Sequence, residues 1–364
     1  MPNNSQLYGK WQRQLAQLSP DGCESRTLNL LWLVVGMFQA RSVHLSLMAR
    51  KIPVRAKKLS LDKRLRRFLN NGSVRVREWY HPVAVSLLEA ATSAGQVQLI
   101  IDSSKVGFGH QLLMVAIAYR RRALPLAWTW VKSKRGHSTT VKQRALLAYV
   151  RSLLPAGVQV SLVGDCEFGR ANLLPTLEDW GWIYALRQPG DHLILPQGCA
   201  RWQRIDAVPL QPGDLLPLGE VALTASHAVS TRLVLYWQKQ EVEPWLLATN
   251  LRCPRAALRL YRHRMWIEEM FGDMKKHGFD LESTHLRHFL RLSRLTLAVC
   301  LLYVWLLAQG ERVLHLALHS EVDRADRRDL SIFRLGWDFI ERRLALDDPL
   351  PRVFVPNFCS VSGG

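Results

Sequence analysis

The pattern of hydrophobic and polar positions changes twice along this chain of 364 residues. The first 92 residues have a helical pattern, with an apolar segment at residues 28–38. From residue 97, short runs of β-branched and aromatic residues follow one another between turn-like or basic breaks, which predicts strands. The expected elements are strands at 97–103, 111–119 and 123–131, a helix at 138–154, a strand at 158–163, a helix at 171–180 and a strand at 182–186.

This order, β-β-β-α-β-α-β, resembles the ribonuclease-H-like core, in which an antiparallel meander continues into parallel α/β units. Pro and Gly punctuation at 188–243 indicates a β-rich insertion, after which a strand at 245–248 resumes the core. A long helix is expected over 254–277, and the remainder is mostly helical. We therefore expect an α/β fold: a ribonuclease-H-like mixed sheet with a β-rich insertion, plus helical N-terminal and C-terminal regions. The expected divisions are 1–92, 93–187, 188–244, 245–284 and 285–364.

The charge of the chain favours a polyanionic partner. Its 49 Lys and Arg outnumber its 30 Asp and Glu, for a formal net charge of +19, more than solubility requires. An acidic membrane surface is the competing interpretation. The apolar stretches 28–40 and 295–310 fall short of the roughly 20 residues of a membrane span, so we expect buried helices instead. The first twenty residues lack the apolar core of a signal peptide, which predicts a cytoplasmic protein.

The six cysteines are scattered, with no C-x-x-C pair and no His at finger spacing. This pattern argues against a zinc site and against a disulfide framework. Cys166, which follows Asp165 in sequence, is expected to be an ordinary thiol because neighbours at a strand end point in opposite directions.

A basic stretch at residues 41–77 contains twelve Lys or Arg and one acid, Asp62. Solvated helix faces normally mix the two signs, so we interpret this stretch as DNA-binding, with a solvated face as the alternative. The expected DNA contacts are Lys57, Lys58, Arg64, Arg66 and Arg67.

Two aspartates end strands of the predicted core. Asp102 follows residues 99–101 of the first strand, and Asp165 follows the fourth strand. In this strand order the first and fourth strands lie side by side, so the two carboxylates could share a divalent ion, which prefers hard oxygen ligands. The alternative for each is a turn residue or a helix cap.

A third carboxylate lies on the expected helix at 254–277. Tyr261, Arg264, Glu268 and Lys275 are spaced so that, at about 100° per residue, they share about 60° of one helix face. Glu268 could complete a metal site, Arg264 and Lys275 could neutralise phosphates, and Tyr261 could donate a hydrogen bond or stack on DNA. An amphipathic surface helix with ion pairs is the alternative.

The spacing Y-x2-R-x3-E-x6-K resembles the signature of the IS-four family of bacterial insertion-sequence transposases. The resemblance covers roughly residues 40–345. It extends to the segments Ile101-Asp102-Ser103, Gly164-Asp165 with Phe168-Gly169, Leu247-Ala248-Thr249-Asn250, and residues 276–282. Family members often have a second acid after the first catalytic Asp, where this chain has Ser103.

The resemblance implies that Asp102, Asp165 and Glu268 hold two Mg²⁺ (or Mn²⁺) ions in a ribonuclease-H-like core. It implies a DNA transposase of cut-and-paste type, acting on double-stranded DNA as a homodimer in the nucleoid. Relatives with a β insertion use it near the cleaved end, and some cut through a DNA hairpin. Trp237 lies in the insertion where such relatives carry a stacking aromatic, with Trp202 and Trp245 as substitutes.

No acid occurs between Asp102 and Asp165, and we expect the basic residues there to surround the metal ligands with positive charge. These residues are Lys105, Arg120, Arg121, Arg122, Lys132, Lys134, Arg135, Lys142, Arg144 and Arg151. Of them, Arg120, Arg121 and Arg122 are expected DNA contacts. Two other functions stay open: a ribonuclease-H-like nuclease that cuts without joining, and a catalytically inactive DNA-binding remnant or repressor.

Overall fold

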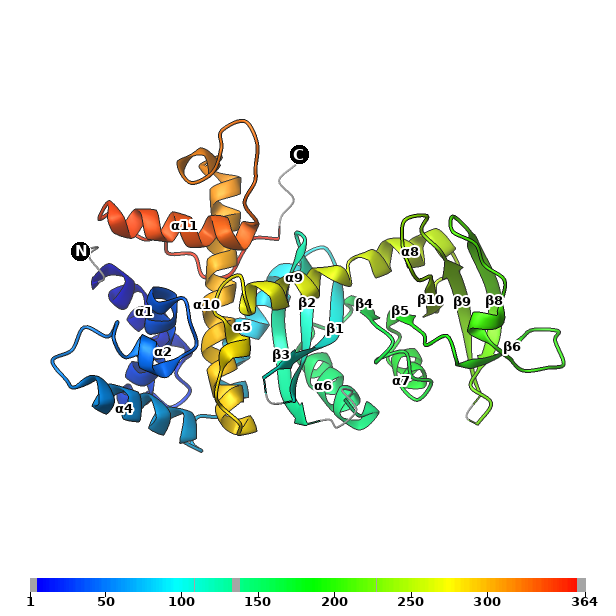
Figure 1. Ribbon diagram of the computed structural model, residues 1–364, viewed down its shortest axis with the longest axis horizontal. Helices are drawn as coiled ribbons and strands as arrows, with labels where there is room; N and C mark the ends of the chain where they lie inside the picture. Colours follow the sequence, from blue (N-terminus) through cyan, green and yellow to red (C-terminus); the bar gives the residue numbers. More distant parts are fainter. Residues whose placement is uncertain (1–4, 108, 133–137, 227, 359–364) are drawn as a thin grey trace. The chain divides into compact units, whose positions relative to one another are not determined.

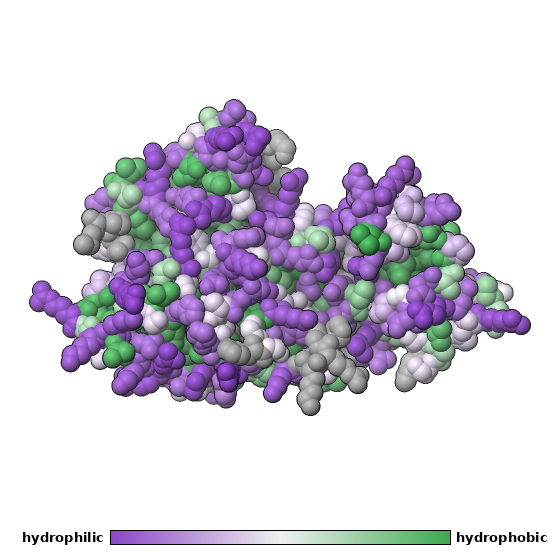
Figure 2. Space-filling view, in the orientation of Figure 1, coloured by the Kyte–Doolittle hydropathy of each residue, from purple (hydrophilic) through white to green (hydrophobic). Residues whose placement is uncertain are grey.

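The computed structural model describes residues 5–107, 109–132, 138–226 and 228–358. The chain divides into two compact units. The helical unit contains residues 1–90, 105–110 and 271–364, and the sheet unit contains residues 91–104 and 111–270. The face seen in Figure 2 is largely hydrophilic, with apolar side chains in scattered patches.

One ten-stranded mixed sheet forms the sheet unit, in the order β3-β2-β1-β4-β5-β10-β9-β8-β6-β7 (Figure 1). Strands β1 (Gln96–Val106), β2 (His110–Tyr119) and β3 (Arg122–Lys132) follow one another as the predicted meander. Parallel pairing then joins β1 to β4 (Gln159–Gly164) and β4 to β5 (Ile183–Arg187). The ribonuclease-H-like order predicted from the hydrophobic pattern is confirmed.

The β-rich insertion is part of the same sheet. It contains β6 (Leu193–Pro196), β7 (Gln203–Arg204), β8 (Leu215–Leu223) and β9 (Val229–Tyr236), with the 3-10 turn η1 (Ile205–Ala207). Its last strand pairs antiparallel with β10 (Trp245–Thr249), which pairs antiparallel with β5. The insertion therefore extends the core sheet by backbone hydrogen bonds.

The helices of the sheet unit follow the predicted order. They are α6 (Thr140–Leu153), capped by the Thr139 hydroxyl, α7 (Leu174–Asp179) and α8 (Pro254–Arg262), which begins with Pro at a favourable position. Helix α9 (Met265–Met274) begins in this unit and ends in the other. The single long helix expected over 254–277 is therefore wrong, because two helices replace it.

The helical unit is built around α10 (Phe289–His315), whose residues 294–311 are all buried. The other helices are α1 (Ser5–Leu18), α2 (Glu24–Ala40), α3 (Leu45–Met48), α4 (Lys58–Asn70), α5 (Val76–Ala91) and α11 (Ile332–Ala345), with 3-10 turns η2 (Leu281–Ser283) and η3 (His319–Glu321). Gly310 and Gly336 let α10 and α11 cross closely, because a Cβ at Gly310 would lie 1.8 Å from the Ile332 carbonyl oxygen.

Helix α10 is longer than the apolar stretch from which it was predicted. Among the described helices it is the one long and apolar enough to cross a membrane, and 83% of its apolar window is buried inside the protein. Its neighbours are α2, α4 and α11. The predicted buried helix is thus confirmed by packing, although the argument from length underestimated the helix.

Candidate active site

The two aspartates lie side by side, as predicted, although β1 continues past Asp102 to Val106 and only Asp165 comes directly after a strand. Strands β1 and β4 are parallel, and their register places Ile101 opposite Gly164, so Asp102 and Asp165 occupy the next position of each chain. The Asp102 side chain is 6% exposed and the Asp165 side chain 32% exposed. One carboxylate is therefore enclosed by protein and the other is open to solvent.

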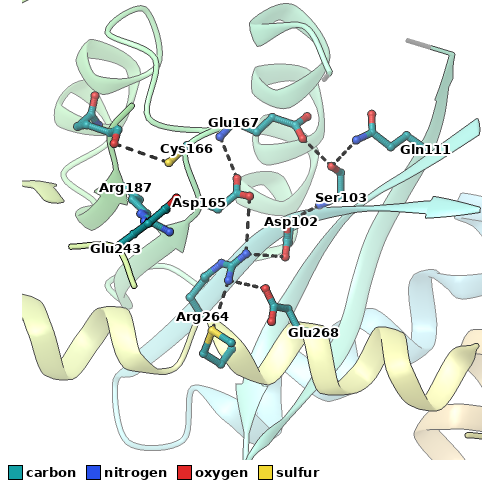
Figure 3. Close-up of polar contacts among 12 residues, drawn as sticks. Asp102, Ser103, Gln111, Asp165, Cys166, Glu167, Arg187, Glu243, Arg264 and Glu268 are labelled. Carbon is teal, nitrogen blue, oxygen red and sulfur yellow. Dashed lines mark hydrogen bonds and ion pairs between the residues drawn. The ribbon is translucent and has the colours of Figure 1, made fainter. Parts of the chain in front are cut away.

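Glu268 completes a group of three carboxylates around Arg264 (Figure 3). The Arg264 guanidinium lies 3.6 Å from a carboxylate oxygen of Asp102, 3.6 Å from one of Asp165 and 2.5 Å from one of Glu268. Two strands and the start of α9 thus bring all three predicted catalytic side chains to one cation.

Arg264 reaches this position because the helix is interrupted there. Helix α8 ends at Arg262 and α9 begins at Met265, so the four side chains do not share the face of one continuous helix. At the break, the His263 ring lies 2.5 Å from the Gln98 side-chain oxygen, Nδ1 to Oε1, and stacks on Trp266 at 4.1 Å. These tertiary contacts coincide with the break, and the local sequence there contains no Gly or Pro.

The other two members of the expected helix face make contacts within the protein. Tyr261 is 3% exposed, its ring packs on Trp245 with centroids 5.0 Å apart, and burial raises its pKa. Lys275 follows α9 and lies 2.8 Å from Glu282, both in the helical unit. Tyr261 therefore supports the structure around β10, while Lys275 has an internal ion-pair partner.

Burial controls the electrostatics of Asp102. It raises the pKa of Asp102 to about 8, against the effect of Arg264 and with that of Asp165. Burial alone would lower the pKa of Arg264, but Asp102, Tyr261 and the other acids raise it above its usual value. The guanidinium therefore stays charged, and Asp102 is the carboxylate on which desolvation acts most strongly.

The carboxylates suit a hard divalent cation in their chemistry. Among the described residues, no three His, Cys, Asp or Glu side chains are close enough to hold one metal ion as they stand. The oxygens of Asp102, Asp165 and Glu268 nevertheless face a shared cationic group, and carboxylate oxygens are the ligands that Mg²⁺ prefers. The donor set fits a divalent metal.

Glu167 is a part of the site that the sequence did not reveal. It is 7% exposed and accepts hydrogen bonds from the Ser103 hydroxyl at 2.6 Å and from the Ser138 backbone N–H and hydroxyl at 2.5 Å each. Its own N–H donates to Asp165, and the Ser103 N–H donates to Asp102. Glu167 thus joins the two aspartate-bearing segments. Its place two residues after Asp165 was the available signal.

Close approach of the backbone also shapes the Asp165 loop. A Cβ at Gly169 would lie 2.0 Å from the Arg187 carbonyl oxygen, so this position accepts only glycine without movement. Cys166 is half-buried, donates to the Gln188 carbonyl at 3.6 Å, and has a pKa raised by burial. The five cysteines of the described part of the chain are all free, and Cys359 lies outside it.

The arginines expected to surround the metal ligands are in part elsewhere. Arg120 and Arg121 form the turn between β2 and β3, both with positive φ. Gln111, which donates to Ser103 beside Asp102, is at the opposite end of β2, about 30 Å away at the usual rise of a strand. Arg122 lies 3.2 Å from Glu269. That expectation is wrong for this turn, and Lys134 and Arg135 lie outside the described residues.

The remaining expected DNA contacts differ in their surroundings. On α4, Arg66 lies 2.9 Å from Asp62, whereas Arg64 stacks on Trp32. Lys57 is exposed and Lys58 half-buried at the start of the same helix. Trp237 follows β9, is half-buried, and donates its indole N–H to the Glu241 carbonyl at 2.9 Å.

Comparisons with known proteins address the sheet unit most directly. A family model described as "Transposase DDE domain" matches residues 93–305. The solved structures with a similar chain include a cryo-EM structure of the piggyBac transposase synaptic complex with hairpin DNA. That likeness has 9% identity and a TM-score of 0.44, and covers 99% of this chain and 84% of the other. A search of curated proteins finds no match.

Proposed function

This chain belongs to the transposase DDE domain family, whose members cut DNA and transfer strands with divalent metals, and we propose that it does so at the ends of an insertion sequence. The proposal assigns cut-and-paste transposition, with the freed 3′ ends joined to target DNA. The spacing of Tyr261, Arg264, Glu268 and Lys275 supports placing the chain within the IS-four family. A homodimer that pairs two ends is part of the proposal.

One observation carries the assignment: three carboxylates from separate segments converge on a single cationic side chain. Like charges rarely cluster around a buried position in a folded protein unless the cluster has a function. Asp102, Asp165 and Glu268 would hold two Mg²⁺ or Mn²⁺ ions. Such ions lower the pKa of an attacking water and stabilise the leaving 3′ oxygen when bound.

The protein's own groups hold this arrangement in place. The Ser103 N–H fixes one oxygen of Asp102 at 2.7 Å, and the Glu167 N–H fixes one oxygen of Asp165 at 2.9 Å. Arg264 supplies a guanidinium that can pair with a phosphodiester as well as with carboxylates. We propose that Lys275 also neutralises backbone phosphate and that Tyr261 orients the segment before Arg264.

Alanine substitutions of the triad test the proposal. Asp102→Ala, Asp165→Ala and Glu268→Ala should each abolish cleavage of end DNA in Mg²⁺ and leave DNA binding nearly intact, because each removes a metal ligand and no base contact. Glu269→Ala is the matched control, since Glu269 is 56% exposed and pairs with Arg122. A labelled end duplex on a denaturing gel gives the measurement. An inactive Glu269→Ala beside an active Glu268→Ala would contradict the assignment.

Joining distinguishes the proposed transposase from the two alternatives. A labelled, pre-cut end incubated with a target plasmid should become covalently attached to the plasmid. Cleavage without attachment would favour a nuclease. Binding without cleavage would favour an inactive DNA-binding remnant or repressor. Arg264→Ala and Lys275→Ala should weaken cleavage more than binding, because they act on the scissile phosphate.

A further inference from the structure

A groove of about 640 Å³ lies between the first turns of α2 and the last turns of α4, within the helical unit. Its lining includes Asn29 of α2, Arg64 and Arg67 of α4, and Asn70 and Asn71 at the end of α4. We call these five residues and the space between them the α2–α4 groove. The groove lies outside residues 93–305, which match the family model.

Arg64 is held in a fixed position in this groove. Its guanidinium lies 4.3 Å from the centre of the Trp32 ring, and its Nε donates to the Asn29 side-chain oxygen at 3.0 Å. Neither contact uses the two terminal amino groups of the guanidinium. No carboxylate pairs with Arg64 among the residues that the structure describes. An arginine ordered in advance, with its charge uncompensated, loses little freedom on binding an anion.

The groove offers donors and few acceptors. The Asn29 oxygen accepts from Arg64, the Asn70 oxygen accepts from Arg291, and the Asn71 oxygen accepts from the Ser73 N–H. The guanidinium groups of Arg64 and Arg67 and the amide NH₂ groups of Asn70 and Asn71 are donors. A ligand with several negatively charged acceptor oxygens fits such a surface.

Two neighbouring basic side chains outside this groove are compensated. Arg66, on the same helix, lies 2.9 Å from Asp62, and Arg75 lies 2.9 Å from Glu78. Arg67 is exposed and pairs with no carboxylate in the described ranges. The basic stretch at 41–77 is therefore not uniform, since Arg66 and Arg75 have acidic partners whereas Arg64 and Arg67 at the groove have none among the described residues.

The end of α4 is also anchored to the core of its unit. Arg294 of α10 is 5% exposed, and donates to the Leu69 carbonyl at 2.7 Å and to the Val74 carbonyl at 3.0 Å. These bonds satisfy a carbonyl at the C-terminus of α4 that would otherwise lack a partner. The segment that carries Arg67, Asn70 and Asn71 is thus held at both sides.

We propose that the α2–α4 groove binds the phosphodiester backbone of duplex DNA, with Arg64 and Arg67 contacting phosphates. The inference rests on the proposed function in taking DNA as the ligand. Phosphate contacts position a duplex and carry no sequence information, so this groove anchors DNA of any sequence. Recognition of a particular end sequence belongs to other parts of the protein.

The test compares three single variants of the full-length protein, Arg64→Ala, Arg67→Ala and Arg334→Ala, with the wild type. Fluorescence anisotropy measures binding to an end duplex and to a scrambled duplex across a salt series in EDTA. Arg64→Ala and Arg67→Ala should each weaken binding to both duplexes about equally and reduce the log–log salt slope by about 0.9. Arg334→Ala, the same charge change on α11 of the same unit, should leave the slope unchanged because Arg334 is paired with Asp338 at 2.8 Å.

Each outcome decides the proposal. Arg64→Ala also removes the contact with Trp32, so thermal unfolding shows whether it folds, and exposed Arg67 gives the cleaner reading. An unchanged salt slope in Arg67→Ala, or an equal loss of slope in Arg334→Ala, contradicts the proposed role of the groove. A loss confined to the end duplex overturns the phosphate assignment in favour of base contacts.

Cleavage by the same proteins separates this inference from the proposed function. Normal cleavage with an Arg67-independent salt slope refutes the groove alone. If Arg67→Ala lowers the salt slope but the wild-type protein does not cleave DNA, the proposed transposase activity is refuted and the proposed groove is not. Absence of any DNA binding refutes both.

Discussion

Replacing Asp102 with Asn should make the protein more stable and catalytically inactive. The Asp102 side chain is 6% exposed, and burial raises its pKa to about 8 from an ordinary value of 3.8. Between these two values the folded protein holds a proton that the unfolded chain has released. The contribution of Asp102 to stability is therefore fully present below about pH 4 and is lost as pH rises toward 8.

The size of this effect follows from the shift. About four pKa units at roughly 1.4 kcal/mol each give a ceiling of about 6 kcal/mol at pH 8. Asn has nearly the same shape, and its oxygen can still accept from the Ser103 N–H. The neutral Asn cannot form an ion pair with Arg264, which would keep two of its three carboxylate partners. The loss of this ion pair offsets part of the gain in stability. We expect a net stabilisation of about 2–4 kcal/mol at pH 8.

The assay is calorimetric unfolding in EDTA at several pH values between 4 and 8.5. Asp165→Asn is the matched control, because the Asp165 side chain is 32% exposed and water already solvates its charge. Both variants should lose cleavage, but only Asp102→Asn should gain stability, and the gain should grow with pH. Equal stability of Asp102→Asn and wild type at pH 8, or a gain that does not depend on pH, would refute the reasoning.

Three further substitutions probe the surroundings of the triad. Glu167→Gln should slow cleavage about tenfold or more with DNA binding unchanged, since an amide NH₂ cannot accept from Ser103 or Ser138; an unchanged single-turnover rate would contradict this. Gly169→Ala should lower the unfolding free energy by a few kcal/mol, because its Cβ would meet the Arg187 carbonyl, whereas Gly72→Ala, with nothing within 4 Å, should change it little in urea unfolding. Trp237→Ala should spare the first nick and reduce hairpin products on a denaturing gel, since base stacking contributes about 1–3 kcal/mol; a normal hairpin yield would reject that role.

The order of strands and helices was predictable because it follows from hydrophobic patterns within short segments. The apolar runs of β1 and β2 each required only neighbouring residues to recognise. The adjacency of Asp102 and Asp165 then followed from topology, since β1 and β4 are parallel neighbours in this order. Both aspartates, and their position beside each other in the sheet, could therefore be predicted from the sequence.

The break between α8 and α9 was not accessible in the same way. Residues 254–277 have helical spacing throughout, and no Gly or Pro marks the interruption. Its contacts, His263 with Gln98 and Arg264 with Asp102 and Asp165, join positions far apart in sequence. The arc on one helix face included Arg264 and Glu268, which lie together beside the aspartates, although Tyr261 and Lys275 make other contacts.

The sequence also did not show where the unpaired basic side chains lie, because the composition gives the number of charges but not the partner of each one. Arg120 and Arg121 were expected beside the metal ligands and form a turn at the far end of β2. Arg66 and Arg67 are adjacent in sequence, yet one has an acidic partner at 2.9 Å and the other is exposed. Tertiary contacts therefore determine which basic side chains remain available to bind DNA.

The contrast between the whole chain and its catalytic centre follows from these contacts. The protein has a formal charge of +19, but Asp102, Asp165 and Glu268 around Arg264 leave a local formal charge of −2 when all three carboxylates are ionised. A broad positive charge attracts the DNA backbone over a long range, whereas a concentrated negative charge favours small divalent cations. Burial of Asp102 opposes full ionisation, so a cation that binds there must also displace a proton near neutral pH. In the proposed metal site, binding of a cation and ionisation of Asp102 are therefore coupled, and Arg264, whose pKa is raised by the same acids, remains charged.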